Sequence, residues 1–100
     1  PPEADPPPAD ILKRESNMYF TYILKSIKDE GYYIGNSDNT EKRLKEHNAG
    51  KTKSIKHRIP FEIKHVEEYA SKTEARKREI HLKKNAKARK DLFDNIHFYD

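Results

Sequence analysis

The sequence contains no cysteine, few apolar residues and no long hydrophobic run. Without cysteine the chain has neither a disulfide nor a thiolate metal site. No apolar stretch approaches the roughly 18–20 residues that a membrane span needs, and the first residues lack the pattern of a secretory signal. These absences exclude the disulfide-rich and membrane-spanning classes, and favour an intracellular, cytoplasmic protein that does not bind membranes.

Hydrophobic residues make up only 33% of the 100 residues, against 38% charged residues. A chain of this length forms one domain, and a domain of this size buries only about 60–65% of its unfolded surface. We therefore expect a small core in which few apolar positions can be spared.

The N-terminal segment 1–17 differs from the rest, because five of the six prolines fall within its first eight positions. Proline removes backbone donors and favours extended geometry, so we interpret 1–17 as an acidic linker, a tag or the tail of an upstream domain. The segment has a net charge of −2 and the whole chain +4, which leaves +6 on residues 18–100. A basic surface favours polyanions such as nucleic acid, although a solvated lysine-rich surface would have the same composition.

Three aromatic or β-branched runs predict strands, and three charged segments predict helices. We expect strands at 18–26, 32–35 and 61–69, and helices at about 38–48, 72–84 and 86–95. The first two strands are joined by a turn through Asp29 and Gly31, which indicates an antiparallel hairpin. Alternation places Tyr22 and Leu24 on one face of the first strand and Ile23 on the other. The order predicts an α+β domain, 18–100, with a small three-stranded antiparallel sheet flanked by helices.

Several small polar residues and glycines are placed where such elements begin or end. Ser37 or Asp38 can cap the first helix, and Gly50 suits a left-handed stop after it. Ser71 and Glu74 form a capping-box pattern before the second helix. Gly35 ends the second strand at a point where we expect a close backbone approach that a side chain would obstruct.

Four residues in the first half of the domain are poorly explained by packing alone. Arg43 and His47 lie four apart on one helix face, where a guanidinium can hold a phosphate and an imidazole can move a proton. Tyr22 and Tyr33 lie on adjacent strands, and a phenol can activate water if a nearby cation lowers its pKa from about 10. The alternatives are an exposed charged face for the helix pair and ordinary cross-strand packing for the tyrosines.

Glu79 lies between Ala75 and Leu82 on the inward stripe of the second helix. A carboxylate there is costly unless an arginine, a metal ion or a water-filled cleft compensates it. The alternative is that Glu79 lies at the edge of the stripe or pairs with Lys83. Together with the phenols, the guanidinium and the imidazole, this carboxylate suggests hydrolysis of a phosphodiester with one divalent cation.

These residues resemble the signature of the GIY-YIG nuclease superfamily, in particular its short single-domain members, relatives of the excision-repair and homing endonuclease domains. "FTY" at 20–22 and "YIG" at 33–35 match the two tripeptides, with Phe20 where glycine is typical. Arg43 falls where the family has its catalytic arginine, and Glu79 matches the metal-binding glutamate. The resemblance covers about residues 18–90 and implies a three-stranded antiparallel sheet flanked by helices.

By this resemblance the protein is a metal-dependent DNA endonuclease with weak sequence preference, acting in DNA repair or processing. It implies one ion, Mg²⁺ or Mn²⁺, held by Glu79, with Tyr22 or Tyr33 as the general base and Tyr22 our choice. Arg43 would stabilise the phosphate charge and His47 would assist. We expect specificity to come from DNA shape, from a fused domain beyond the proline-rich segment or from an associated partner. We also expect DNA to contact basic residues in and after the first helix: Lys42, Lys51, Lys53, Lys56, His57 and Arg58.

Two other hypotheses remain open from the sequence. A non-catalytic nucleic-acid-binding module would need only the basic segments, and a small interaction domain would use its charge only for solubility. Nicking versus double-strand cutting, RNA binding and the oligomeric state are not determined by the sequence.

Overall fold

The computed structural model describes residues 18–98, and the proline-rich segment 1–17 and residues 99–100 lie outside the described residues. Three strands form one antiparallel sheet in the order β2-β1-β3. The strands are β1 (Tyr19–Ser26), β2 (Tyr32–Ser37) and β3 (Phe61–Tyr69). The predicted α+β architecture with a three-stranded sheet is confirmed, and β2 is two residues longer than predicted, since it continues past Gly35 to Ser37.

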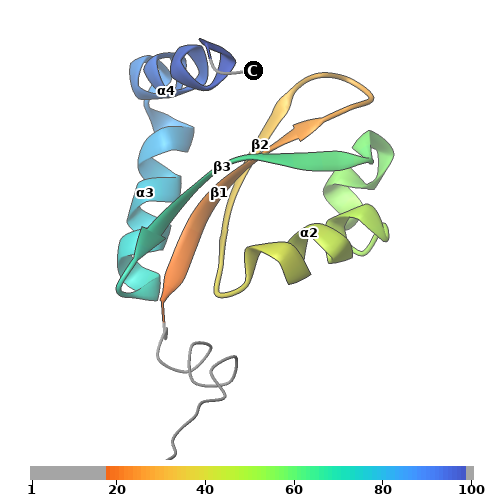
Figure 1. Ribbon diagram of the computed structural model, residues 1–100, viewed down its shortest axis with the longest axis horizontal. Helices are drawn as coiled ribbons and strands as arrows, with labels where there is room; N and C mark the ends of the chain where they lie inside the picture. Colours follow the sequence, from red (N-terminus) through yellow and green to blue (C-terminus); the bar gives the residue numbers. More distant parts are fainter. Residues whose placement is uncertain (1–17, 99–100) are drawn as a thin grey trace, which may run out of the picture.

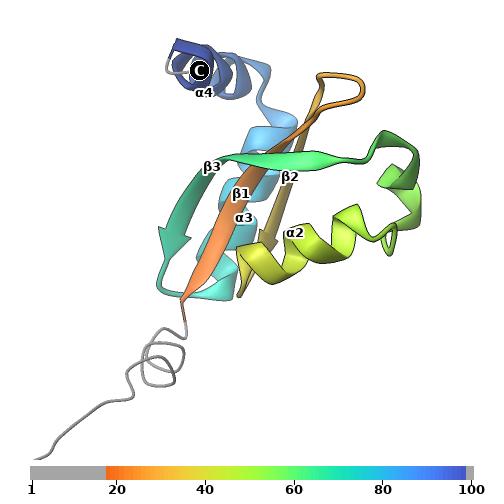
Figure 2. The ribbon, with the colours of Figure 1, turned by 45° about the vertical axis from the view of Figure 1, so that its right-hand side comes forward.

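Helices cover both faces of this sheet (Figures 1 and 2). Helix α2 (Thr40–Asn48) and a short 3₁₀ helix η1 (Lys53–Arg58) lie on one side, and α3 (Lys72–Lys84) lies on the other. Helix α4 (Ala86–Phe98) follows α3 after a sharp turn. None of the helices within residues 18–98 is long and apolar enough to cross a membrane.

Side-chain alternation along β1 divides the core into two clusters. Tyr22 and Leu24 pack with Ile55 and Phe61 on the α2 side, while Ile23 faces the opposite cluster. The second cluster lies under α3 and α4 and contains Ile23, Ile34, Leu82 and Ile96. The predicted alternation is therefore correct, and the central strand is buried on both faces because each face has its own helix layer.

The helix ends follow from local hydrogen bonds, with one correction to the sequence prediction. The N-cap of α2 is Asn39, whose Oδ1 accepts from the backbone N–H of Lys42 at 3.0 Å, so neither Ser37 nor Asp38 caps the helix. An asparagine side chain is as good a cap as either, and Ser37 still belongs to β2. Gly50 has φ +78, as predicted for a left-handed stop.

Helix α3 begins as predicted, because the Ser71 hydroxyl accepts from the backbone N–H of Glu74 at 3.2 Å. Helix α4 reaches Phe98 rather than 95, and Ile96 in its last turn is buried in the second core cluster. Burial of this apolar side chain against the sheet extends a helix whose sequence pattern is weak, since tertiary packing outweighs propensity.

Candidate active site

A buried tyrosine–histidine pair lies at the centre of the α2 side. The hydroxyl of Tyr22 and Nε2 of His47 are 3.0 Å apart, and Nδ1 of His47 lies 2.8 Å from Oγ1 of Thr52. Tyr22 is 2% exposed and His47 is fully buried. The strand and the helix thus bring together two of the predicted residues, and Thr52, which sequence reasoning missed, fixes the imidazole from the other side.

Gly35 explains how the Tyr22 phenol reaches across the neighbouring strand. Gly35 is the partner of Tyr22 in the β1–β2 ladder, and a Cβ atom there would lie 2.5 Å from the Tyr22 hydroxyl. Only glycine leaves room for that oxygen. The expected close approach at Gly35 is therefore present, but the approaching group is a side chain and not the backbone.

Burial sets the protonation states of this pair. Burial, followed by the neighbouring Tyr33, raises the pKa of Tyr22 to about 12, although the Arg43 guanidinium acts in the opposite direction. Burial and the charge of Arg43 lower the pKa of His47 below its ordinary value. Near neutral pH, Tyr22 is therefore a phenol and His47 a neutral imidazole. Arg43 lowers the pKa of Tyr22, as expected, but this effect is smaller than the increase caused by burial.

Tyr33 and Arg43 complete this side of the site. The Tyr33 ring is 5.2 Å from the His47 ring in an edge-on arrangement and 6.4 Å from the Tyr22 ring. Arg43 donates from Nη1 to the Glu46 carboxylate at 3.0 Å, and its side chain is 40% exposed. A half-exposed guanidinium held by a carboxylate one turn along the helix can exchange that partner for a phosphate.

Glu79 approaches from the other face of the sheet, on α3. Its carboxylate accepts from the side-chain amide of Asn36 and forms an ion pair with Nζ of Lys83 at 2.5 Å. The pairing with Lys83 that the sequence left open as an alternative is thus present. The charge of Glu79 also raises the pKa of Tyr22, as the weakest of several contributions. The carboxylate therefore acts weakly on the Tyr22 phenol, although it contacts the sheet on the other face.

Asn36 was not recognised as a site residue from the sequence. Its position one residue after Gly35 puts its side chain on the α3 face, where it meets Glu79. Strand alternation predicts that face, but the choice of Glu79 as partner depends on how α3 lies over the sheet.

The donor set can be tested for a divalent cation. Among residues 18–98 no group of three or more His, Cys, Asp or Glu side chains is placed to hold a metal ion. Mg²⁺ needs no such cage, because it keeps several waters and binds through one or two carboxylates plus substrate phosphate oxygens. Glu79 is one such carboxylate, with its side chain 14% exposed, so the residues fit an ion completed by water and substrate.

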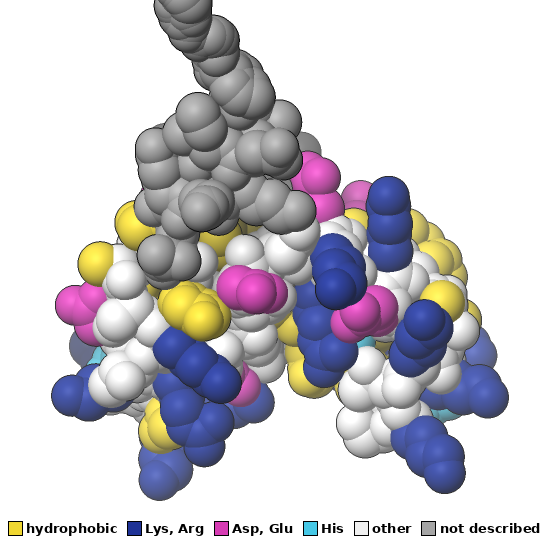
Figure 3. Space-filling model, turned by 90° about the horizontal axis from the view of Figure 1, so that it is seen from below, with side chains coloured by type: hydrophobic (Ala, Val, Ile, Leu, Met, Phe, Trp, Pro, Cys, Tyr) yellow, Lys and Arg dark blue, Asp and Glu magenta, His cyan; other side chains and the backbone are white. Residues whose placement is uncertain are grey.

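The predicted DNA-binding residues fall into two groups. Five of them are exposed on α2, η1 and the loop between them: Lys42, Lys51, Lys53, Lys56 and His57. Arg58 is placed differently, since its Nε lies 2.7 Å from the Asp29 carboxylate and its guanidinium stacks over Phe61. Arg58 therefore ties η1 to the β1–β2 turn. In the view of Figure 3 an indentation divides the molecule into two lobes, and Lys and Arg side chains lie on both of them.

The fold and these side chains define a catalytic domain of the nuclease type. The chain belongs to the GIY-YIG catalytic domain family, whose model matches residues 18–91. The resemblance drawn from the two tripeptides, Arg43 and Glu79 is thereby confirmed at the level of the family.

Similar proteins occur in bacteria and archaea under the name UPF0213. The chain is 38% identical over 80 residues to UPF0213 protein YazA of Bacillus subtilis, covering 79% of this chain and 80% of that protein. It is 35% identical over 75 residues to a UPF0213 protein of Halobacterium salinarum, covering 74% and 96%. A UPF0213 protein of Clostridium perfringens is 43% identical over 68 residues, covering 67% and 72%. No solved structure matches the chain significantly.

Proposed function

We propose that the protein is a metal-dependent endonuclease that hydrolyses DNA phosphodiester bonds with weak sequence preference. The observation that carries the proposal is the position of these groups on the two faces of β2 at neighbouring residues. On one face the Tyr22 hydroxyl, in contact with His47, lies against Gly35, and on the other face Glu79 accepts from Asn36, the next residue. A basic domain of this size can hold a DNA backbone, but phosphate contacts alone specify no base sequence.

The proton of the attacking water passes through the tyrosine–histidine pair. A phenol with a pKa near 12 is a poor acceptor at neutral pH unless it gives up its own proton at the same time. Both partners of His47 are hydroxyl groups, so the contacts allow the tautomer in which Nδ1 donates to Thr52 and Nε2 accepts from Tyr22, and the proposed step uses that tautomer. Tyr22 can therefore take a proton from water as it passes one to His47.

Arg43 and Glu79 both act on the negative charge of the scissile phosphate, Arg43 directly and Glu79 through the ion. Arg43 exchanges Glu46 for a nonbridging oxygen of the scissile phosphate and stabilises the negative charge that develops there. Glu79 holds the divalent ion, Mg²⁺ or Mn²⁺, which when bound supplies Lewis-acid polarisation of the phosphate. Asn36 fixes the Glu79 carboxylate by donating to it, and Tyr33 orients the water or the phosphate beside His47.

The expected products are a 3′-hydroxyl and a 5′-phosphate, released by in-line attack of water. Substrate choice would come from DNA shape, from a domain beyond the proline-rich segment or from a partner. We propose that the protein acts inside the cell, in DNA repair or processing. Exposed Lys42, Lys51, Lys53, Lys56 and His57 would contact neighbouring phosphates.

The test is cleavage of supercoiled plasmid and branched DNA, with and without Mg²⁺. Tyr22→Phe removes the hydroxyl that contacts His47, and we expect its rate to fall by about 100- to 10,000-fold. The matched control is Tyr69→Phe, which removes another hydrogen-bonded phenol, on β3 and far from Gly35, and is expected to cut normally. No nicking of any substrate by the folded parent protein would overturn the proposal.

The second candidate is a nucleic-acid-binding module without catalysis, which the basic side chains on both lobes favour (Figure 3). Glu79→Ala separates the two. Catalysis predicts that Mg²⁺-dependent cleavage disappears while DNA affinity changes little. A pure binder predicts no cleavage by the parent protein and no Mg²⁺ requirement.

A further inference from the structure

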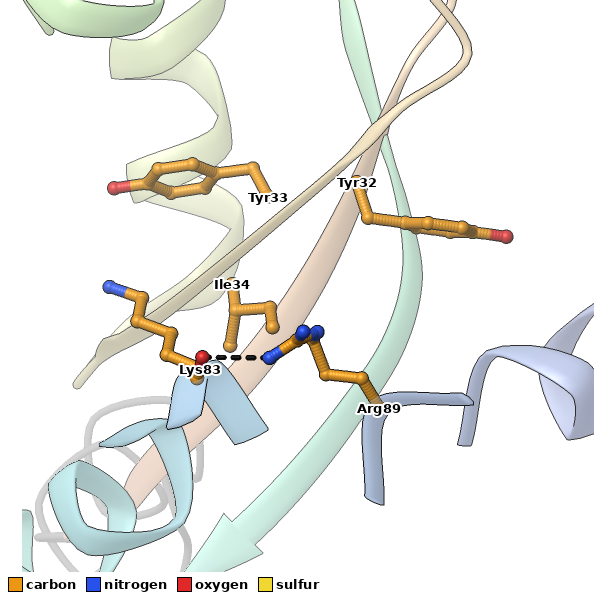
Figure 4. A pocket seen from close by; sticks show the side chains of 5 residues that line it. All are labelled: Tyr32, Tyr33, Ile34, Lys83 and Arg89. Carbon is orange, nitrogen blue, oxygen red and sulfur yellow. Dashed lines mark hydrogen bonds between the residues drawn. The ribbon is translucent and has the colours of Figure 1, made fainter. Parts of the chain in front are cut away.

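A shallow hollow of about 290 Å³ lies along the free edge of β2, beside the candidate active site. Three consecutive β2 residues and one cation each from α3 and α4 line it: Tyr32, Tyr33, Ile34, Lys83 and Arg89 (Figure 4). Its volume is at the lower limit of the roughly 300–1,000 Å³ typical of pockets for drug-sized ligands. The hollow is therefore large enough for part of one nucleotide, and its open side leaves room for the rest.

Lys83 connects this hollow to the candidate active site. It lines the hollow and also pairs with the Glu79 carboxylate, one helical turn earlier. Its side chain is 48% exposed, so the ammonium group can turn from Glu79 to another anion without unfolding any element. One path for a phosphodiester strand whose scissile phosphate lies near Glu79 runs over this lysine and into the hollow.

Arg89 is held firmly at the other end of the hollow. Its Nη1 donates to the backbone carbonyls of Leu82 and Lys83, at 2.9 and 2.7 Å. These carbonyls belong to the last turn of α3, where helix geometry leaves acceptors without intrahelical partners. Since both bonds use Nη1, the remaining N–H groups of the planar fork are available to a phosphate in the direction of the hollow.

The two tyrosine rings beside the hollow pack against other aromatic rings. The Tyr32 ring stacks on Phe93 of α4 with centroids 4.2 Å apart, and the Tyr33 ring rests against His47. The two rings leave β2 in opposite directions, with Ile34 between the cations (Figure 4). Aromatic and apolar walls beside two cations match a nucleotide, which has a flat ring and a phosphate.

We propose that this hollow is a binding subsite for the nucleotide next to the scissile phosphate. The phosphate of that nucleotide lies between Lys83 and Arg89, and its sugar and base rest against the β2 side chains. The inference rests on the proposed function for the position of the scissile phosphate. The proposal also implies that Lys83 leaves Glu79 when the DNA strand binds. DNA binding would then free the Glu79 carboxylate to hold the ion.

The test uses ¹⁵N-labelled protein titrated with thymidine 3′,5′-bisphosphate in the absence of divalent metal. We expect chemical-shift changes at the backbone amides of Tyr32, Ile34, Lys83 and Arg89. Thymidine alone and inorganic phosphate, added separately, should produce much smaller changes. Changes confined to α2 and η1, or equal changes with inorganic phosphate alone, would overturn the inference.

Arg89→Met tests the phosphate contact on DNA, and Lys90→Met is the matched control. Lys90 carries the same charge one position later on α4, is exposed and pairs with Asp94. We expect Arg89→Met to reduce the slope of log affinity against log salt by about 1 on a short duplex, and Lys90→Met to leave the slope unchanged. In cleavage assays the loss for Arg89→Met should fall on KM rather than on kcat. Equal slopes for both variants would contradict the subsite.

Arg89 also donates to the carbonyls at the end of α3, so its replacement could disturb that helix end. Lys83→Met is therefore a second variant, because it leaves those carbonyl contacts in place. It is expected to lower the affinity for the bisphosphate at least threefold. No loss of affinity with a folded Lys83→Met protein would overturn the inference. Nucleotide binding in the hollow by a protein that cuts no DNA would refute the proposed function alone, and cleavage without binding in the hollow would refute the subsite alone.

Discussion

A glutamate lies on the α3 side at each free edge of the sheet, Glu67 on β3 and Glu79 on α3 beside β2, and the two carboxylates are held very differently. At the β3 edge, Glu67 accepts from Nε and Nη2 of Arg78 at 2.8 and 3.1 Å, and from His65 and Tyr69. At the β2 edge, Glu79 is held by Asn36 and Lys83. Arg78 and Glu79 are neighbours on α3, so the same helix turn serves both edges.

The difference lies in which carboxylate can change partners. Burial by itself raises the pKa of Glu67, but the hydrogen bonds from Arg78, His65 and Tyr69 outweigh it and hold that pKa at about 2. A planar guanidinium fork fixes its carboxylate geometrically, whereas a lysine is a flexible point charge. Glu67 is thus locked into a structural network, while Glu79 can exchange its lysine for an ion.

The largest expected difference between the edges is in catalysis. Glu79→Gln removes the negative charge that would hold the ion, and we expect plasmid nicking to fall by on the order of 100-fold or more. Glu67→Gln changes the same chemical group at the other edge and is expected to cut within about threefold of the parent rate at 25 °C. Initial nicking rates in saturating Mg²⁺ measure both.

The free energy of unfolding should fall more for Glu67→Gln than for Glu79→Gln, the reverse of the order in catalysis. Glu67→Gln leaves Arg78 facing an amide and breaks a partly buried network, so we expect a loss of about 1–3 kcal/mol in the free energy of unfolding. Glu79→Gln keeps an acceptor for Asn36 and loses an ion pair whose lysine is half-exposed, which contributes at most about 1 kcal/mol. Urea unfolding followed by circular dichroism measures both, and a larger loss for Glu79→Gln would contradict the comparison.

The contribution of the Glu67 network to stability should also depend on pH. The folded pKa of Glu67 is about 2 and its ordinary value is 4.5, so the unfolded state binds a proton first. The contribution of this group is complete above pH 4.5 and is lost as the pH falls from 4.5 towards 2. We expect the unfolding midpoint of the parent to approach that of Glu67→Gln as the pH is lowered through this window. A constant gap between the two melting curves from pH 6 to pH 2.5 would contradict it.

The smallest expected effect concerns the ion itself. Lys83→Met removes the cation that competes for Glu79, and we expect Mn²⁺ to bind about two- to fivefold more tightly in the absence of DNA. Lys84→Met removes the next lysine, which is exposed, and should not change the affinity. Mn²⁺ electron paramagnetic resonance titrations measure the binding, and weaker binding by Lys83→Met would show that the lysine does not compete.

Local patterns in the sequence predicted most of the elements. The bounds of β3 and α3, the Ser71 cap and the Gly50 stop each depend on residues within one turn or one strand. The Asn39 cap was missed because three adjacent residues are all suitable caps, and only the path of the chain after β2 selects among them. The full length of α4 was missed because burial of Ile96, and not helix propensity, stabilises its last turn.

Within the candidate site, the sequence identified side chains but not their contacts. Arg43 and His47 could be placed on one face because helix periodicity relates them. The bonds of Tyr22 to His47 and of Glu79 to Asn36 join residues 25 and 43 positions apart, and no local pattern relates such distant positions. The raised pKa of Tyr22 also depends on burial that arises only when α2 covers the sheet.

The sequence by itself determined the strands, the helices, the family and a set of candidate site residues, because these depend on short-range periodicity and on residue type. Only the tertiary structure decided that Glu79 reaches the edge of β2 from the opposite face and that Glu67 is locked by Arg78. It also decided that a hollow with two cations adjoins the site. These features depend on how helices dock across a sheet, which is set by the packing of two small cores and not by any single segment.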